Sequence, residues 1–446
     1  MEDAGCFPHS PSLIHNKGVS DSRSFGFETR MLHAGQVPDP YVGARAVPIY
    51  QTTSYVFGDS DEAAHLFELK QYGNIHSRIS NPTTAVLEER IASLENGTGA
   101  VAVASGMAAQ FAVFMTLANP GDHFVASNQL YGGTSTQMTH TLKKLSIDVT
   151  FVDPDDLSAW EAAIRPTTRG LYLETIGNPV GRIADLETVG KLAAERYIPL
   201  IVDNTFGTPY LCRPIDWGAT LVVHSATKFI GGHGTSIGGV VIDSGEFDWS
   251  GTPTLADPSP AYHGMRFYDT FGHYGFLTKL RAETVRDTGA CISPMNSFLL
   301  LQGLETLALR MDRHTANALA VARYLEGHPK VATVHYAGLP SHPHHERAKK
   351  YLPKGPGAVF SFELKENADV REEGKRFIEG LHLFSHLANV GDAKSLVIHP
   401  ASTTHQQLSD AELHAGGIGP GLIRLSVGLE SVDDLLWDLD QALAQA

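Results

Sequence analysis

The chain has 446 residues, with 34 Lys and Arg against 49 Asp and Glu, and a formal net charge of −15. This acidic balance argues against nucleic acid and anionic membranes as partners, and no apolar run reaches the length of a membrane span. Three cysteines without a CxxC pair predict neither a structural zinc site nor a disulfide framework, and they fit a reducing compartment. We therefore expect a cytoplasmic protein with two domains, or one large domain with an appendage.

The N-terminal part lacks the patterns of a packed domain. Residues 1–26 are rich in Ser, Pro and Gly and have no apolar core, which predicts a disordered tail rather than a signal peptide. Residues 25–60 have few helix signals and contain PIYQTTSYVF, so we expect an extended arm, which the domain division places at 27–82. An amphipathic helix is expected at 83–96, closed by Gly97.

From there, short apolar runs alternate with helical patterns. Strands are expected at 100–105, 123–127, 148–153, 170–175, 199–205, 220–225 and 238–243. Because these runs are apolar on both faces, they predict an α/β fold with a mostly parallel sheet covered by helices on both faces. Ligands of such sheets bind beyond the carboxyl ends of the strands, so the residues at strand ends are the candidates for a site.

The C-terminal part has a different pattern of apolar and helical segments. Residues 244–270, rich in Gly, Pro and aromatics, predict a surface insertion in a large domain that spans 83–291. A helical stretch at 292–327 then leads into the short runs VATVHYAG, GAVFSFEL, SLVIHP and IRLSV. These alternating strands between helices predict a smaller α+β domain at 292–446.

Three strand ends carry residues with possible chemistry. Gly106 and Met107 open a helix, whose N-terminus can hold an anion, although a glycine at such a junction is often only a turn. Asp203 closes the apolar run PLIVD, either as a helix cap or as the counter-charge of a heterocyclic cation. Lys228 follows TLVVH among small residues, either as a surface lysine or as a desolvated amine able to bond a carbonyl.

Taken together, these residues predict a pyridoxal 5′-phosphate site. Lys228 would bond the aldehyde, and Asp203 would keep the pyridine nitrogen protonated so that the ring accepts electrons. Tyr131, in QLYGGT after a strand, would stack on the ring. The predicted phosphate cradle consists of Gly106, Met107, Ser225 and Thr227.

Five short motifs, taken in their order along the chain, resemble those of a known enzyme family. They are SRISNPT (77–83), ASGMAA (104–109), DNTF (203–206), HSATK (224–228) and IRLSVGLE (423–430). With them, nearly the whole chain resembles the Cys/Met-metabolism family of PLP-dependent transsulfuration enzymes, which have PLP-dependent transferase fold type I. The tract LFSHLANVGDAKSLVIHPASTTHQQLS (383–409) is most similar to O-acetylhomoserine sulfhydrylases.

The resemblance implies a role for each matching residue. Lys228 would also shuttle protons, with help from Tyr131. Arg424 would bind the substrate α-carboxylate as a bidentate fork, in a pocket that Asn178 and Ser395 also line.

It further implies contacts to the cofactor beyond the cradle. Thr205 would belong to the cofactor-binding residues, and Arg78 would reach the phosphate of a neighbouring subunit, because the family builds each site across a dimer. His76 stands where family members usually have tyrosine on the phosphate; it can still donate, but it is shorter and titrates near neutrality. The expected assembly is a homo-oligomer, a tetramer built from dimers.

The implied reaction is γ-replacement on O-acetyl-L-homoserine, in which sulfide or a thiol displaces acetate to give homocysteine or methionine. Cystathionine γ-synthase or γ-lyase activity, and substitution by a carbon or nitrogen nucleophile in secondary metabolism, stay open, as does a succinyl leaving group. A nicotinamide dehydrogenase would need GxGxxG after the first strand, which ASGMAAQ does not supply. A non-catalytic PLP-fold protein would lack the lysine or its aspartate partner. The histidine runs lack the spacing typical of metal-binding residues, so no metal is expected.

Overall fold

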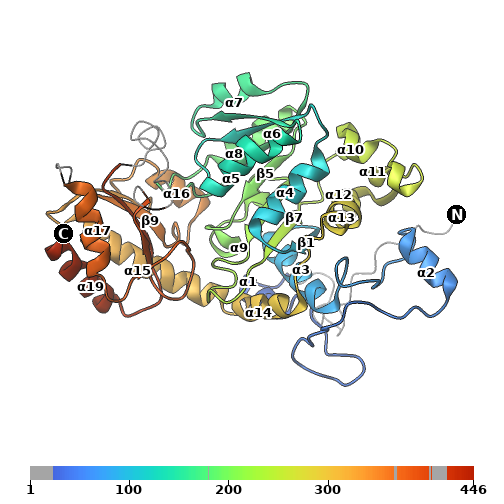
Figure 1. Cartoon of the computed structure of the whole chain (residues 1–446), viewed down its shortest axis with the longest axis horizontal. Coiled ribbons are helices and arrows are strands. Elements are labelled where there is room, and N and C mark those ends of the chain that lie inside the picture. Colours follow the sequence, from blue (N-terminus) through green and yellow to red (C-terminus); the bar gives the residue numbers. More distant parts are fainter. Residues whose placement is uncertain (1–23, 179, 366–368, 401–402, 404–418) are drawn as a thin grey trace.

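The computed structural model describes residues 24–178, 180–365, 369–400, 403 and 419–446 (Figure 1). The tail expected at 1–26 lies almost entirely outside the described residues. Within the described part, the strands form a seven-stranded sheet at the centre of the molecule and a five-stranded sheet near the C-terminus. The large sheet is built from β1 to β7 and the small sheet, which is drawn in orange to red in Figure 1, from β8 to β12.

The seven-stranded sheet has the order β1-β7-β6-β5-β4-β2-β3. Its strands are β1 (Gly99–Val103), β2 (His123–Ser127), β3 (Asp148–Val152), β4 (Thr168–Glu174), β5 (Leu200–Asp203), β6 (Leu221–Ser225) and β7 (Gly239–Asp243). Neighbouring strands are parallel except at β7, which runs antiparallel to both β1 and β6. The predicted mostly parallel sheet is confirmed, and all its strands except β7 end at the same edge.

Helices cover both faces of this sheet because its strands present apolar side chains to both sides. In β5, Leu200 and Val202 pack in one hydrophobic cluster, together with α3 (Pro82–Glu95) and α8 (Leu186–Glu195). Ile201 packs in a second cluster on the opposite face, together with α4 (Gly106–Leu117). Successive side chains of β5 thus point to opposite faces of the sheet, and each face is covered by the helices that pack on those side chains.

The remaining helical segments of this region are short. Before and within the large sheet they are α1 (Phe27–His33), α2 (Ser60–Phe67), α5 (Gly132–Thr136), the π-helical turn η1 (Gln137–Thr141), α6 (Leu142–Lys144), α7 (Leu157–Ala163) and α9 (Thr208–Leu211). After β7 they are α10 (Pro253–Ala256), α11 (Phe267–Phe271), α12 (Gly275–Lys279), the π-helical turn η6 (Leu280–Val285) and α13 (Arg286–Thr288). The short 3₁₀ turns are η2 (Pro214–Trp217), η3 (Trp249–Gly251), η4 (Pro260–Tyr262) and η5 (Gly272–Tyr274).

The five-stranded sheet has the order β10-β11-β12-β9-β8. Its strands are β8 (Val331–His335), β9 (Val359–Leu364), β10 (Ser385–His386), β11 (Leu396–Ile398) and β12 (Leu422–Ser426). The helices that lead into it and cover it are α14 (Pro294–Leu304), α15 (Leu307–Glu326), α16 (His345–Tyr351), α17 (Val370–Gly380) and α19 (Val432–Gln445). The helical stretch expected at 292–327 is therefore two helices, and the four expected strands are joined by the short strand β10.

Two expectations were wrong in part. The arm expected at 25–60 begins with α1, because Met31 is 3% exposed and accepts a hydrogen bond from the backbone of Ala308. The segment 244–270 is not a surface insertion throughout, because its Trp249 and Phe267 are fully buried and Trp249 stacks on Phe276 with ring centroids 5.1 Å apart. Among the described helices, none combines the length and the apolar character that crossing a membrane requires.

Candidate active site

The carboxyl ends of the parallel strands meet at one edge of the large sheet. Glu174 ends β4, Asp203 ends β5 and Ser225 ends β6, while β1 leads into Gly106 and β2 into Tyr131. A cavity of about 240 Å³ lies there. Its lining includes ten residues that the sequence singles out: Gly106, Met107, Tyr131, Asn178, Asp203, Thr205, Ser225, Thr227, Lys228 and Arg424.

Lys228 lies three residues beyond β6 and is half-buried in the lining of this cavity. Its Nζ donates a hydrogen bond to Oδ1 of Asn389. Burial, and next the positive charge of Arg424, lower the pKa of Lys228 to about 8. A larger fraction of the amine is therefore neutral near physiological pH than for an ordinary lysine, and the neutral amine is the form that bonds a carbonyl.

Asp203, at the end of β5, lines the same cavity with its carboxylate. Its Oδ1 accepts a hydrogen bond from the backbone N–H of Thr205 at 2.9 Å. Desolvation raises the pKa of Asp203, the hydrogen bonds from Thr205 offset part of this shift, and none of the ion pairs among the described residues involves this carboxylate. A largely buried carboxylate without a cation fits a cationic ring nitrogen, which would restore the ordinary pKa.

The N-terminus of α4 provides the anion cradle. The cap residue Ser105 accepts from the backbone N–H of Ala108 at 3.1 Å, which leaves the N–H groups at the start of the helix available for a ligand. Gly106 is required there, because a Cβ at this position would stand 2.6 Å from the Cβ of Ser225. Thr205 holds Ser225 in place, since its hydroxyl accepts from the Ser225 N–H at 2.8 Å.

Thr227 also lines the cavity, and its hydroxyl bonds the backbone of Gly238. It donates to the Gly238 carbonyl at 3.2 Å and accepts from the Gly238 N–H at 3.1 Å. A helix N-terminus flanked by two hydroxyl side chains suits a phosphate, so the residues present fit the phosphate end of the cofactor that the sequence predicts.

Arg424 reaches the cavity from β12 of the small sheet. Its Nη1 donates to Oδ1 of Asn178 at 3.2 Å, which joins the small sheet to the segment after β4. Burial lowers the pKa of Arg424 to about 10, and the guanidinium stays charged at neutral pH. Such a fork, aimed into a pocket beside Lys228, can bind a carboxylate through two parallel hydrogen bonds.

Ser395 lies elsewhere, in contrast to the prediction. It is fully buried outside the residues that line the cavity. Its hydroxyl donates to the Glu430 carboxylate at 2.9 Å and accepts from the Gly428 N–H at 2.8 Å. With both functions of the hydroxyl used inside the small sheet region, Ser395 supports the loop before β11 rather than the pocket.

His76 and Arg78 also lie outside the cavity of their own chain. His76 accepts from the backbone N–H of Arg78 at 3.1 Å, and the exposed guanidinium of Arg78 donates to the carbonyl of Arg286. Their expected contact is with the cofactor of a neighbouring subunit, and it stays a prediction.

The sequence analysis missed several lining residues. They are Ser105, Gln110, Thr134, Glu174, Ile176, Phe206, Ile237, Ala388, Asn389 and Val390. Glu174 could have been found, because it stands at the end of β4 as Asp203 stands at the end of β5, and the two are paired in register. The segment 388–390 carried no such signal, because it comes from the small sheet region.

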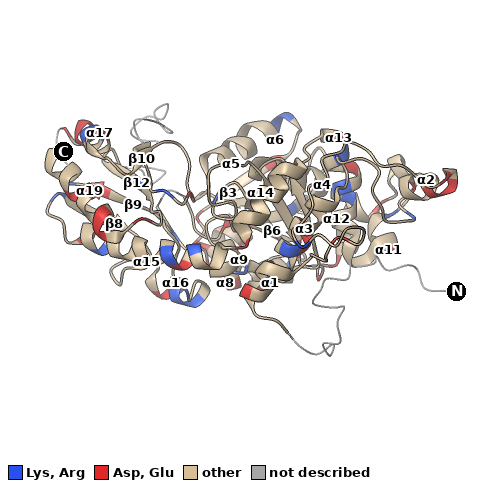
Figure 2. Ribbon diagram, turned by 90° about the horizontal axis from the view of Figure 1, so that it is seen from below, with Lys and Arg blue, Asp and Glu red and all other residues tan. Residues whose placement is uncertain are grey.

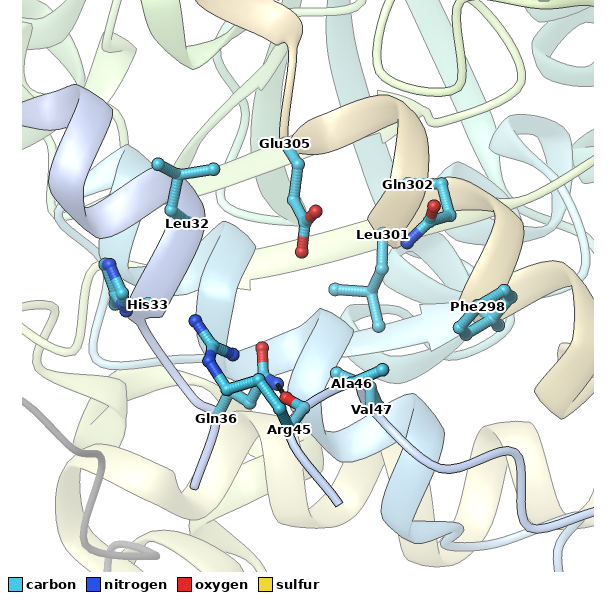
Figure 3. A pocket seen from close by; sticks show the side chains of 10 residues that line it. All are labelled: Leu32, His33, Gln36, Arg45, Ala46, Val47, Phe298, Leu301, Gln302 and Glu305. Atoms are coloured by element: carbon cyan, nitrogen blue, oxygen red, sulfur yellow. Dashed lines mark hydrogen bonds between the residues drawn. The ribbon is translucent and has the colours of Figure 1, made fainter. Parts of the chain in front are cut away.

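A second cavity, of about 250 Å³, lies between α1, the segment after it and α14. Figure 3 shows Glu305 pointing into a space that Gln36 and Arg45 border from the other side. Glu305 is bound by Arg90, whose Nη1 lies 3.1 Å from its Oε1. None of the predicted site residues lines this cavity.

Comparisons with known proteins agree with the geometry. A family model described as Cys/Met metabolism PLP-dependent enzyme matches residues 28–444. An O-acetyl-L-homoserine sulfhydrylase of Leptospira meyeri is 49% identical over 442 residues, covering 97% of this chain and 99% of that protein. A homocysteine synthase of Schizosaccharomyces pombe is 51% identical over 425 residues, covering 94% of this chain and 98% of that protein.

A solved structure is similar along nearly the whole length. It is an O-acetylhomoserine (thiol)-lyase of Campylobacter jejuni that carries N′-pyridoxyl-lysine-5′-monophosphate, with a TM-score of 0.91 and 41% identity. The match covers 94% of this chain and 100% of that one.

Proposed function

Because the chain belongs to the Cys/Met metabolism family of PLP-dependent enzymes, we propose that it catalyses γ-replacement on O-acetyl-L-homoserine. Sulfide or a thiol displaces acetate, giving homocysteine with sulfide and methionine with methanethiol. The observation that carries this proposal is that Lys228, Asp203 and Arg424, from two different sheets, line one cavity.

The protein's own residues would hold pyridoxal 5′-phosphate at three points. Lys228 bonds the aldehyde, Asp203 pairs with the pyridine nitrogen, and the start of α4 binds the phosphate with Ser225 and Thr227. Support comes from the low pKa of the lysine, the unpaired position of the carboxylate and the close approach of Gly106 to Ser225. When bound, the cofactor draws electrons from the substrate's Cα and so makes its proton acidic.

The substrate is oriented by its α-carboxylate, which Arg424 and Asn178 bind. The Lys228 amine then takes the Cα proton, a task for which a pKa near neutrality is favourable. A Cβ proton is lost next, and acetate leaves Cγ with the electrons of the C–O bond. The sulfur nucleophile forms the new Cγ–S bond, and protons return to Cβ and Cα.

We further propose a homo-oligomer in which the segment before α3 contacts a neighbouring subunit. Figures 1 and 2 both show α2, whose acidic residues are red in Figure 2, projecting away from the two sheets. Apolar side chains elsewhere in the segment before α3 are strongly exposed, with Val56 99%, Tyr41 90% and Val42 81% accessible. Such a surface is typical of a protein interface.

One assay tests the reaction. The purified protein, supplied with pyridoxal 5′-phosphate, is given O-acetylhomoserine with sulfide, methanethiol, cysteine or an amine, and O-succinylhomoserine with sulfide. We expect homocysteine and acetate in equal amounts, fastest with sulfide or methanethiol. Faster product formation with cysteine, an amine or the succinyl ester would contradict the proposed substrates and identify that compound as the preferred one. Sedimentation of the same sample gives the oligomeric state, and a monomer would contradict the proposed assembly.

A further inference from the structure

We propose that Glu174 is a positioning residue, whose buried carboxylate fixes the backbone of Tyr131 so that the phenol ring stands against the cofactor. This inference rests on the proposed role of Tyr131 as the residue that stacks on the cofactor ring. It adds a residue that the sequence motifs do not point to, and it explains how an exposed tyrosine keeps one orientation.

The first observation is a hydrogen bond between the two residues. The backbone N–H of Tyr131 donates to Oε1 of Glu174 at 2.6 Å. Tyr131 is the cap residue of α5, with φ −53° and ψ 135°, and its own side chain makes no capping hydrogen bond. Glu174, only 8% exposed at the end of β4, therefore anchors the start of α5 to the large sheet.

The second observation is that the tyrosine side chain is not fixed at its far end. The side chain lines the cavity, yet the residue is 51% exposed. Its hydroxyl makes no hydrogen bond to any other residue that the structure describes. The orientation of the ring must therefore come from the backbone and from the surface on which the ring lies.

That surface is Gly133. A Cβ at position 133 would stand 2.5 Å from Cε1 of Tyr131, so the ring lies directly over the glycine backbone. Real Cβ atoms do not approach another atom so closely, and a larger residue there would push the ring away. Glu174 thus holds the backbone of Tyr131, and the missing side chain at Gly133 leaves room for its ring.

Glu174 also has a neighbour that offers another explanation. It is paired in register with Asp203, at the ends of the neighbouring strands β4 and β5. Burial, and then the charge of Asp203, raise the pKa of Glu174 well above its ordinary value. A direct electrostatic effect of Glu174 on the cofactor is therefore the rival role, and amide and alanine replacements separate the two roles.

The experiment uses the holoenzyme and four variants: Glu174→Gln, Glu174→Ala, Tyr131→Ala and the Glu174→Ala/Tyr131→Ala double variant. The readouts are the dissociation constant of pyridoxal 5′-phosphate, the induced circular dichroism of its visible band, and kcat/KM. Glutamine keeps an accepting oxygen for the Tyr131 N–H, so we expect near wild-type values. Alanine removes the acceptor of the Tyr131 N–H, and we expect cofactor binding weakened at least about fivefold with a smaller dichroism signal.

The double variant decides whether Glu174 acts through Tyr131. We expect Glu174→Ala to add nothing once Tyr131 is alanine, because the residue to be positioned is gone. An equal loss in both backgrounds, or a Glu174→Gln variant as impaired as Glu174→Ala, would overturn the inference and favour the electrostatic role. A Glu174→Ala variant with wild-type values would overturn it as well.

Gly133→Ala provides an independent test if Glu174→Ala does not fold. Thermal unfolding of each variant shows whether it folds. We expect Gly133→Ala to reproduce the Glu174→Ala effects, whereas Gly251→Ala, with nothing within 4 Å of its added Cβ, should match wild type. A normal Gly133→Ala enzyme contradicts the inference. Failure of the proposed function would look different, because wild-type protein itself would then lack the cofactor band or the turnover.

Discussion

The side-chain nitrogen of Lys228 donates a hydrogen bond to Oδ1 of Asn389 at 2.5 Å, across 161 positions of the sequence. Lys228 follows β6 of the large sheet, whereas Asn389 lies between β10 and β11 of the small sheet. The contact closes the cavity with a segment from the other end of the chain. It also gives the amine a defined resting place next to Arg424, which approaches from the same small sheet.

Replacing Lys228 by alanine should abolish turnover and the visible absorbance of the bound cofactor, because the described residues that line the cavity include no other lysine to bond the aldehyde. Proton transfer by a positioned group typically contributes about 10²–10⁴-fold to a rate, and here the covalent attachment is lost in addition. Absorbance spectra and homocysteine formation measure the two effects. Lys349→Ala, which removes an exposed lysine outside the cavity, serves as the control. Retained absorbance and turnover in Lys228→Ala would refute the assignment.

Uptake of pyridoxal 5′-phosphate by the cofactor-free protein should depend on pH. The pKa of Lys228 is lowered to about 8, so the neutral amine that attacks the aldehyde grows as the pH rises through that value. We expect the uptake rate to increase from pH 7 to 9 and then level off, well below the range of an ordinary lysine. Stopped-flow absorbance measures it.

The charge of Arg424 contributes to this lowering. In Arg424→Gln the midpoint should therefore move to higher pH, since one cation fewer stands beside the amine. An unchanged or lower midpoint would show that burial alone sets the pKa of Lys228.

Replacing Arg424 by lysine should raise KM for O-acetylhomoserine more than it changes the affinity for the cofactor. Lysine keeps the charge but loses the planar fork that binds a carboxylate through two hydrogen bonds. Hydrogen bonds to charged groups contribute about 1.5–3 kcal/mol, so a loss of about 10- to 100-fold in kcat/KM is expected. Initial rates over a range of substrate concentrations test this.

The same measurement with Asn178→Ala examines the partner of Arg424. A smaller loss is expected, because Asn178 accepts only one hydrogen bond from the guanidinium, at 3.2 Å. If Arg424→Lys leaves KM unchanged, the substrate carboxylate binds elsewhere.

Replacing Glu95 by alanine should destabilise the fold without touching the cavity lining. Its Oε1 lies 2.6 Å from Nε2 of His224, and both side chains are fully buried beneath the large sheet. Without Glu95, the buried Nε2 of His224 and Nδ2 of Asn204 lose a hydrogen-bond partner, and leaving a buried polar group unsatisfied costs about 1–3 kcal/mol in the free energy of unfolding. Chemical denaturation measures the loss.

Glu161→Ala is the matched control, because its carboxylate is 47% exposed and 3.9 Å from Arg196. Exposed pairs of this kind contribute about 0–1 kcal/mol, so its unfolding free energy should stay close to wild type. Equal losses of unfolding free energy in the two variants would show that the buried Glu95–His224 pair stabilises the fold no more than an exposed pair does.

The sequence by itself determined the large sheet and the part of the site that lies at its strand ends. Apolar runs and helical patterns are local signals, and the ends of parallel strands meet at one edge whatever the helices do. Gly106, Asp203 and Lys228 each follow their own strand closely, so their convergence could be predicted. Glu174 also ends a parallel strand, so its place at the same edge was predictable in the same way. Its hydrogen bond to the backbone of Tyr131 was not, because no sequence pattern indicates it.

Only the tertiary structure decided which residues of the small sheet region face the cavity. Asn389 lines it, whereas Ser395, six positions later, turns its hydroxyl to Glu430 instead. Likewise, α1 forms where Met31 packs on Ala308, and Trp249 is buried within a segment whose composition suggests a surface. Hydrophobic periodicity is set by near neighbours in the chain, but the direction of a side chain in a loop is set by partners tens to hundreds of residues away, which the pattern does not contain.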